Sequence, residues 1–109
     1  NNAVLAPGMF ASHYSPNKPM LIDDGKNTAE IDKSKAGFIS YSGANTQGYS
    51  KVLRLTYAAD LREYAANLFE AMHLLEDSDV EIIIAEEVPA QGLGIAIMDR
   101  LRKAANVGK

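Results

Sequence analysis

A short, almost continuous apolar run at residues 80–85 constrains the fold more than any other feature of the sequence. The run is rich in β-branched residues and is interrupted only by Glu81. β-Branched residues favour extended backbone, and a strand that is apolar on both sides needs cover on both faces. Strands of this kind are typical of parallel sheets, whose connecting segments pack against the two faces. The run therefore predicts a strand inside a largely parallel sheet.

The segments around this run alternate between strand and helix patterns. Apolar residues recur at helical spacing and predict a helix of about four to five turns that opens near Asp60: Leu61, Tyr64, Ala65, Leu68, Phe69, Met72 and Leu75. Other patterns predict strands and helices as follows: strands at 20–22, 37–41 and 52–55, a weak short helix at 28–35 and a C-terminal helix at 93–105. The order strand, helix, strand, strand, helix, strand, helix predicts a three-layer α/β domain.

Residues 1–19 form a separate, extended leader in this interpretation, and residues 20–109 form the α/β domain. The leader contains prolines, which disfavour helix at and before their positions: Pro7, Pro16 and Pro19. It also contains Met9, Phe10 and Tyr14, which are too apolar for a freely solvated linker, so we expect it to lie on a surface. The chain begins with Asn1 and not with Met. We therefore expect a processed protein or a fragment of a longer one.

Length and composition exclude several functional classes. The chain has 109 residues, which is enough for one domain with its own core. A formal net charge of −3 argues against nucleic-acid binding through bulk positive charge. The absence of cysteine excludes disulfides, thiolate catalysis and cysteine-based metal sites. No apolar run approaches the ~18–20 residues that cross a bilayer. We expect a cytoplasmic domain without direct contact to membranes or nucleic acids.

Acidic residues are concentrated in residues 60–99, which contain ten acids and a single base, Arg62. The last ten residues contain four bases and no acid, a charge that suits the C-terminal end of a helix dipole. Solvated surface is the simple interpretation of both segments. An acidic docking surface for a basic partner protein is the alternative.

One candidate ligand site is Gly92-Leu93-Gly94, which follows a predicted strand and opens a predicted helix. Glycine loops that cradle phosphates occupy this position in α/β folds. However, Ile97 replaces the third glycine of the dinucleotide-binding pattern. A tight turn between strand and helix explains the glycines more simply. Gly92 and Gly94 are kept as candidate ligand residues beside that structural interpretation.

A second candidate is the loop at residues 42–48, which follows another predicted strand. Ser42, Gly43 and Asn45 offer backbone amides and small polar side chains. Open α/β sheets bind ligands at the carboxyl ends of their strands, where this loop would lie. The loop lacks the lysine and the glycine spacing of a phosphate-binding P-loop. A plain surface loop is therefore the favoured interpretation.

Neither histidine belongs to a catalytic or metal-binding set. His73 lies among apolar residues late in the long predicted helix, and partial burial or exposure explains it. His13 follows Ser12 in the leader, but adjacent side chains without an orienting acid do not make a triad. No His and carboxylate cluster has the spacing of a metal site. The sequence predicts no catalytic residue and no metal site.

The string from Ala6 to Pro16 reads Ala-Pro-Gly-Met-Phe-Ala-Ser-His-Tyr-Ser-Pro. It resembles the interdomain linker of long-form L-threonylcarbamoyl-AMP synthases, the YrdC/Sua-five family. That linker typically reads Ser/Ala-Pro-Gly-Met, three variable residues, His-Tyr, then Ala/Ser-Pro. Residues 67–69 and 92–101 resemble the C-terminal accessory domain of the same family. The resemblance covers nearly the whole chain.

The resemblance implies an enzyme of two parts, of which this chain is the accessory half. An N-terminal YrdC-like domain would condense ATP, L-threonine and bicarbonate to threonylcarbamoyl-AMP and pyrophosphate, for the t6A modification of tRNA. That catalytic domain would be the partner of this chain and would bind ATP, Mg²⁺ and L-threonine. Its own motifs are absent here, since Lys18-Pro19 and the string at 42–45 lack the family context. The accessory half would be Rossmann-like, without a cofactor of its own.

The resemblance also implies that the linker lies over the catalytic cavity as a lid. The linker residues concerned are Pro7, Gly8, Met9, His13, Tyr14 and Pro16. The string departs from the family at residues 10–12, where many relatives carry Lys-Tyr-Arg. Loss of that arginine argues against a direct charge contact with a phosphate, whereas the retained His and Tyr can still form hydrogen bonds and stack. Simple tethering of two domains is the alternative role.

A different class of function remains open beside this one. The domain could be a freestanding module that binds a nucleotide or another small ligand through Gly92-Leu93-Gly94 or through the loop at 42–48. Saturable binding by the chain alone would distinguish this hypothesis from a purely accessory domain.

Overall fold

The computed structural model describes residues 18–106, which form one α/β unit around a four-stranded sheet. The strands are β1 (Met20–Asp23), β2 (Ala36–Ser40), β3 (Lys51–Arg54) and β4 (Ile82–Glu86). They lie in the order β1-β4-β2-β3, and every pairing is parallel. The prediction of an α/β fold with a largely parallel sheet is confirmed.

Strand β4 occupies an inner position, as its apolar run predicts. It pairs with β1 on one side and with β2 on the other, and Ile83, Ile84 and Ala85 are fully buried. Alternate residues of the strand serve two separate clusters, because successive side chains point to opposite faces. Ile83 and Ala85 face the main core, whereas Ile84 faces the second cluster. Because both faces of β4 are covered, its apolar and polar residues do not alternate.

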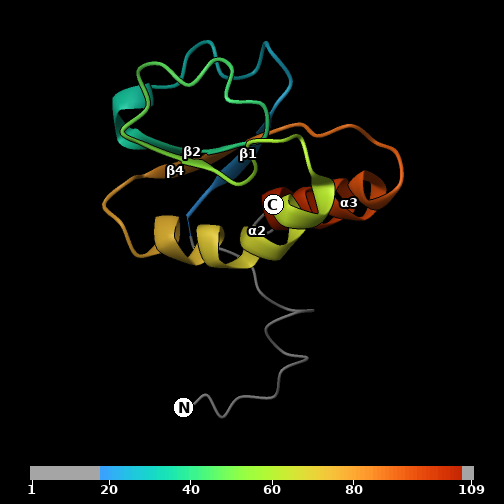
Figure 1. Ribbon diagram of the computed structural model, residues 1–109. Coiled ribbons are helices and arrows are strands. Elements are labelled where there is room, and N and C mark those ends of the chain that lie inside the picture. The colour runs from blue at the N-terminus through green and yellow to red at the C-terminus, as the bar shows by residue number, and fades with distance from the viewer. Residues whose placement is uncertain (1–17, 107–109) are drawn as a thin grey trace.

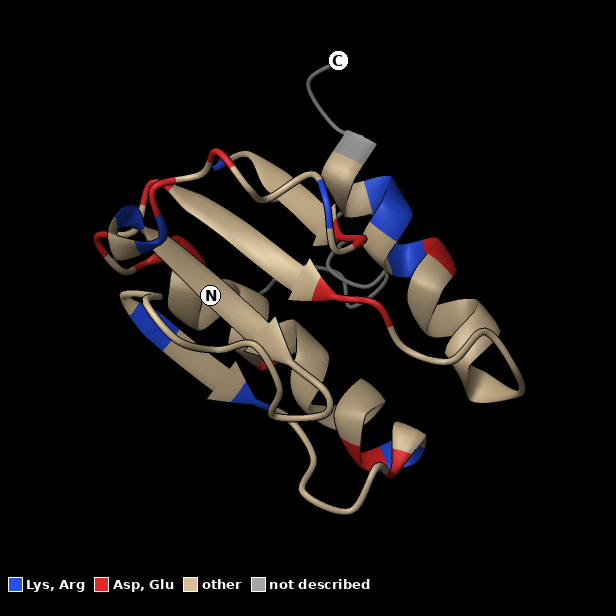
Figure 2. Ribbon diagram, turned by 90° about the horizontal axis from the view of Figure 1, so that it is seen from above, with Lys and Arg blue, Asp and Glu red and all other residues tan. Residues whose placement is uncertain are grey.

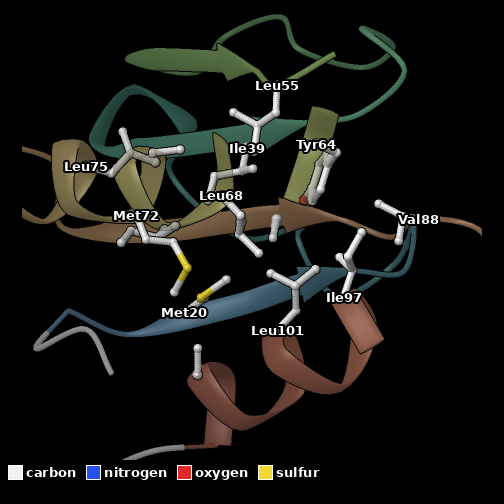
Figure 3. Packing of buried hydrophobic residues seen from close by; sticks show 14 of the residues in the cluster. Met20, Ile39, Leu55, Tyr64, Leu68, Met72, Leu75, Val88, Ile97 and Leu101 are labelled. Atoms are coloured by element: carbon white, nitrogen blue, oxygen red, sulfur yellow. The ribbon is translucent and has the colours of Figure 1, made fainter. Parts of the chain in front are cut away.

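Both helices cover the same face of the sheet. They are α2 (Leu61–Glu76) and α3 (Leu93–Asn106), and Figure 1 shows them together on one side of the strands. Their apolar stripes meet alternate strand residues in the main core. Figure 3 shows side chains of both helices in this cluster, among them Tyr64, Leu68, Met72, Leu75, Ile97 and Leu101. The helical spacing in the sequence therefore marks the buried stripe of α2.

The opposite face is covered by loops and one short turn of 3₁₀ helix, η1 (Lys33–Lys35). Its cluster contains Phe38 and Ile84, and the ring of Phe38 stacks on Tyr49 with 4.6 Å between centroids. The predicted helix at 28–35 is wrong, because only its last residues form a helical turn. The side chain of Asp24 accepts hydrogen bonds from the backbone N–H groups two and three residues on, at 2.9 Å each. Such local bonds favour turns over helix, so the third layer consists of loops.

The N-terminus of α2 is capped by Asp60. Its carboxylate accepts hydrogen bonds from the N–H groups of Arg62 and Glu63, two of the donors that a helix start leaves unpaired. This confirms the predicted opening of the helix at Asp60.

The other end of α2 holds the start of the described chain. The ammonium group of Lys18 donates to the carbonyl oxygens of Leu75, at 3.1 Å, and Ser78, at 2.5 Å. A cation is favourable at the C-terminal end of a helix dipole. Pro19 follows, and its carbonyl oxygen accepts from the N–H of Ile83 at 3.0 Å. The chain is therefore anchored to the domain from Lys18 onward.

Leu75 and Leu74 provide a matched test of the core. Leu75 is 1% exposed and packs against Gly37, whereas its neighbour Leu74 is 54% exposed. We expect Leu75→Ala to lower the free energy of unfolding by about 2–5 kcal/mol, because it leaves a cavity between α2 and β2. Leu74→Ala is expected to change it by less than about 0.5 kcal/mol. Chemical denaturation measures both values, and equal losses would contradict this assignment of the core.

Candidate functional site

The candidate site is the edge of the sheet where the strands end. Because all pairings are parallel, β2, β3 and β4 present their carboxyl ends at one edge, and the segments that follow them meet there. This is the usual place for ligands in open α/β sheets. Glu86 is the last residue of β4, and Arg54 is the last residue of β3. Figure 2 shows acidic segments in red and basic segments in blue at ends of strands. Charged side chains of opposite sign thus end the two strands that flank β2.

Glu86 connects the end of β4 to the loop that follows β2. Its carboxylate accepts hydrogen bonds from the N–H groups of Tyr41, at 2.6 Å, and Ser42, at 2.9 Å. It also accepts from the hydroxyls of Ser42, at 2.5 Å, and Ser40, at 3.4 Å. Three of these donors share Oε1, and the hydroxyl of Ser42 meets Oε2. Glu86 therefore holds the loop in place.

The predicted residues of the 42–48 loop lie beside this connection. The hydroxyl of Ser42 is used internally, since it donates to Glu86 and accepts from the N–H of Ala44 at 3.1 Å. Gly43 has a φ of +83°, and its N–H donates to the hydroxyl of Ser40 at 2.9 Å. Asn45 is exposed and has a φ of +60°, a conformation that asparagine tolerates better than most residues. The structure thus brings Ser42 and Gly43 to the strand ends, and whether they bind a ligand stays a prediction.

Arg54, which ends β3, lies against the same loop. Its Nε atom donates to the carbonyl oxygen of Thr56 at 3.0 Å, and its guanidinium group lies 4.5 Å from the ring centre of Tyr57. On the loop side, a Cβ atom built on Gly43 would stand 2.5 Å from Nη1 of Arg54. The absence of a side chain at Gly43 therefore makes room for the guanidinium group.

The second predicted loop follows β4 and leads into α3. Gly92 has a φ of +57° and open space around its Cα. Gly94 is buried, and a Cβ atom built on it would overlap the carbonyl oxygen of Pro89 at 1.8 Å. The close approach that requires glycine at 94 is therefore to the chain's own backbone. This packing explains Gly94 without a phosphate, and a ligand at Gly92 or Gly94 stays a prediction.

Sequence reasoning missed both Glu86 and Arg54. A usable signal exists, because each is the charged last residue of a strand. Their partners come from different segments, however, and only the pairing of the strands shows which ones they meet. The predicted linker residues Pro7, Gly8, Met9, His13, Tyr14 and Pro16 lie outside the described residues.

The hydroxyl of Tyr64 is the least satisfied polar group near this edge. Its side chain is 0% exposed, and Oη has no hydrogen-bond partner among residues 18–106. Its ring makes an edge-to-face contact with Tyr41, with centroids 5.9 Å apart. Burial, with a smaller contribution from the negative charge of Glu86, raises the pKa of Tyr64 well above the usual value for tyrosine.

Within residues 18–106, no group of three His, Asp or Glu residues is placed to hold a metal ion. No helix there has the length and apolar character needed to cross a membrane.

Glu86 and its neighbour Glu87 offer a matched test of the loop connection. We expect Glu86→Ala to lower the free energy of unfolding by about 1–3 kcal/mol, because it leaves the buried hydroxyl of Ser40 and the N–H of Tyr41 without this acceptor. Glu87 is exposed, and Glu87→Ala should have little effect. Amide hydrogen exchange should speed up at Tyr41 and Ser42 only in the first variant. Unchanged exchange at these amides would contradict the connection.

The raised pKa of Tyr64 predicts a loss of stability in alkali. Above a pH of ~10 the unfolded chain releases the phenol proton while the folded chain keeps it, so rising pH favours unfolding. The contribution of this group is up to about 1.4 kcal/mol per pH unit. We expect Tyr64→Phe to flatten the dependence of unfolding free energy on pH above 10, and the exposed Tyr57→Phe to leave it as it is. Equal slopes for the two variants would contradict the role of Tyr64.

Comparison with known proteins shows the family of the chain. Residues 1–106 match the model of a family described as threonylcarbamoyl-AMP synthase, C-terminal domain. The chain is 32% identical to the threonylcarbamoyl-AMP synthase of Bacillus subtilis, over 96% of this chain and 33% of that protein. It is 34% identical to the enzyme of Pyrococcus abyssi, over 92% of this chain and 32% of that protein. The chain thus spans about a third of the length of these relatives.

Solved structures show the same relationship. The crystal structure of P. abyssi Sua5 complexed with L-threonine matches with a TM-score of 0.67 and 30% identity, over 85% of this chain and 29% of that one. The C-terminal Sua5 domain of a Pyrococcus horikoshii protein matches with a TM-score of 0.57 and 28% identity, over 81% of this chain and 93% of that one. From its sequence and its fold, the chain belongs to the family of C-terminal domains of threonylcarbamoyl-AMP synthases.

Proposed function

We propose that this chain serves as the accessory domain of an enzyme that joins ATP, L-threonine and bicarbonate into threonylcarbamoyl-AMP, with release of pyrophosphate. Such an enzyme is a nucleotidyltransferase that binds ATP, works in the cytoplasm and supplies the t6A modification of tRNA. The observation that carries the proposal is the extent of the family match. Nearly all of this chain aligns with about a third of each relative, which leaves room for a catalytic domain outside the match.

The chemistry of the described residues supports an accessory role. Glu86, the carboxylate that ends β4, is engaged by the loop after β2. ATP and Mg²⁺ are proposed to bind to the catalytic domain, as the resemblance to the family implies. The L-threonine named with the P. abyssi structure is assigned to the same part of the protein.

The linker at residues 1–19 is proposed to act as a lid over the active site of the catalytic domain. The anchoring of Lys18 supports this proposal. Its ammonium group donates to the carbonyl oxygen of Leu75, in the last turn of α2, and to that of Ser78, just after the helix. These two bonds give the linker a fixed starting point on the domain. A segment held at a fixed end can be aimed at a neighbouring cavity, whereas a simple tether needs no such attachment. Pro7 and Pro16 limit the paths that the segment can take.

The test uses the intact enzyme and measures pyrophosphate release with ATP, L-threonine and bicarbonate. Replacing residues 6–16 by Gly and Ser residues of the same number keeps the tether but removes the linker sequence. We expect turnover to fall by roughly tenfold or more, since misplaced groups at an active site have effects of this size. Wild-type turnover after this replacement would leave only tethering and contradict the lid.

Two variants of the intact enzyme test the anchor of the linker in the same assay. Lys18→Met removes the anchor, and Lys26→Met removes an exposed charge elsewhere as its control. We expect lower turnover for the first variant and wild-type turnover for the second. The 109-residue chain alone is expected to release no pyrophosphate. Release by that chain would contradict an accessory role altogether.

A further inference from the structure

Arg54 ends β3 at the carboxyl edge of the sheet and is only partly buried. Among residues 18–106, no acidic side chain forms an ion pair with its guanidinium group. The acid that ends β4 is not available to it, because Glu86 bonds the loop after β2. Asp60, which follows β3, caps α2.

The guanidinium group of Arg54 is held on three sides. Its Nε atom bonds the carbonyl oxygen of Thr56, a residue that is fully buried. The hydroxyl of Thr56 in turn accepts from the N–H groups of Ala58 and Asp60, at 3.3 and 3.0 Å. The ring of Tyr57 covers one side of the guanidinium group, and the backbone of Gly43 lies close to Nη1. Little conformational freedom is left to lose when a ligand binds.

The donors that remain define what the group can recognise. An arginine has five N–H donors, and the bond to Thr56 uses the one on Nε. The two Nη atoms keep the donors that match two oxygens of a carboxylate or phosphate. A planar, oriented and uncompensated cation at the carboxyl edge of a parallel sheet therefore has the chemistry of an anion receptor.

We propose that Arg54 is the centre of an oxyanion-binding site on this domain, with Gly43 and Tyr57 holding it in position. The ligand is a small molecule with a phosphate or carboxylate group. The site belongs to the domain itself and does not depend on the lid assigned to the linker. In this proposal Arg54 contacts the ligand, whereas Ser42 supports the loop through its hydrogen bonds to Glu86 and Ala44.

The experiment titrates the 109-residue chain with inorganic phosphate and, separately, with acetate, at constant ionic strength held by chloride. The C-terminal domain of the P. horikoshii relative has been solved as a separate chain, so this domain is suited to study alone. NMR follows the side-chain N–H of Arg54 and the amides of Gly43 and Thr56. We expect saturable shifts at these groups. Tighter saturation by phosphate identifies a phosphorylated ligand, and tighter saturation by acetate identifies a carboxylate. No saturation by either anion overturns the proposal.

Three variants distinguish binding by an oriented guanidinium group from binding by positive charge alone. Arg54→Gln removes the cation and Arg54→Lys keeps it without the two-pronged geometry, and both are expected to weaken binding at least tenfold. Gly43→Ala keeps the charge but places a Cβ atom 2.5 Å from Nη1, at a φ of +83° that strains alanine. The guanidinium group must then shift, so binding should also weaken several-fold. Arg62→Gln, which neutralises an exposed arginine of α2, is the control and should bind as the wild type does. Equal weakening by Arg62→Gln, or undiminished binding by both Arg54 variants, would show general charge screening and overturn the proposal.

Discussion

The structure depends on the burial of β4 on both of its faces. An inner parallel strand satisfies its backbone hydrogen bonds with neighbours on each side, and its side chains need apolar cover above and below. Ile83 and Ala85 receive that cover from α2 and α3. Ile84 lies beside Phe38 of β2, and Ile31 and Tyr49 from the loops pack against this pair. Because the two helices lie on one face, the loops must cover the other. The loop between β2 and β3 contributes to this cover through Tyr49, whose ring stacks on Phe38.

That requirement explains the chemistry at the carboxyl edge. A loop over an apolar face still needs partners for its own N–H groups, and Glu86 supplies them from the neighbouring strand. The same loop opens space at Gly43, and the guanidinium group of Arg54 fills it. One negative side chain ends β4 and one positive side chain ends β3, on either side of β2, and their roles differ. The carboxylate is consumed by the fold, and the guanidinium group keeps donors for an external anion.

Local patterns in the sequence were sufficient for most of the fold. The strands and both long helices lie where the patterns place them, within one or two residues at their ends. The short helix expected at 28–35 is wrong: its first half forms a turn, in which the N–H of Ile31 bonds the carbonyl oxygen of Thr28. Asp32 then caps only the short turn η1. At the carboxyl edge of the sheet, the pattern indicated the loop with Ser42 and Gly43, whose ligand role stays a prediction, but not Arg54 or Glu86. A loop is recognisable from its own composition, whereas a charged strand end takes its role from the strand beside it.

The sequence by itself determined the α/β class, the inner strand and the family, because these follow from the spacing of apolar residues and from a linear motif. Only the tertiary structure decided the strand order and, with it, which side chains meet. Glu86 and Tyr41 are far apart along the chain, and the parallel pairing of β2 with β4 places them in contact. The roles of Gly94 and Arg54 were decided in the same way, by the backbone that each one approaches. The spacing of apolar residues indicates which face of a helix or strand is buried, but it does not indicate which segment covers that face.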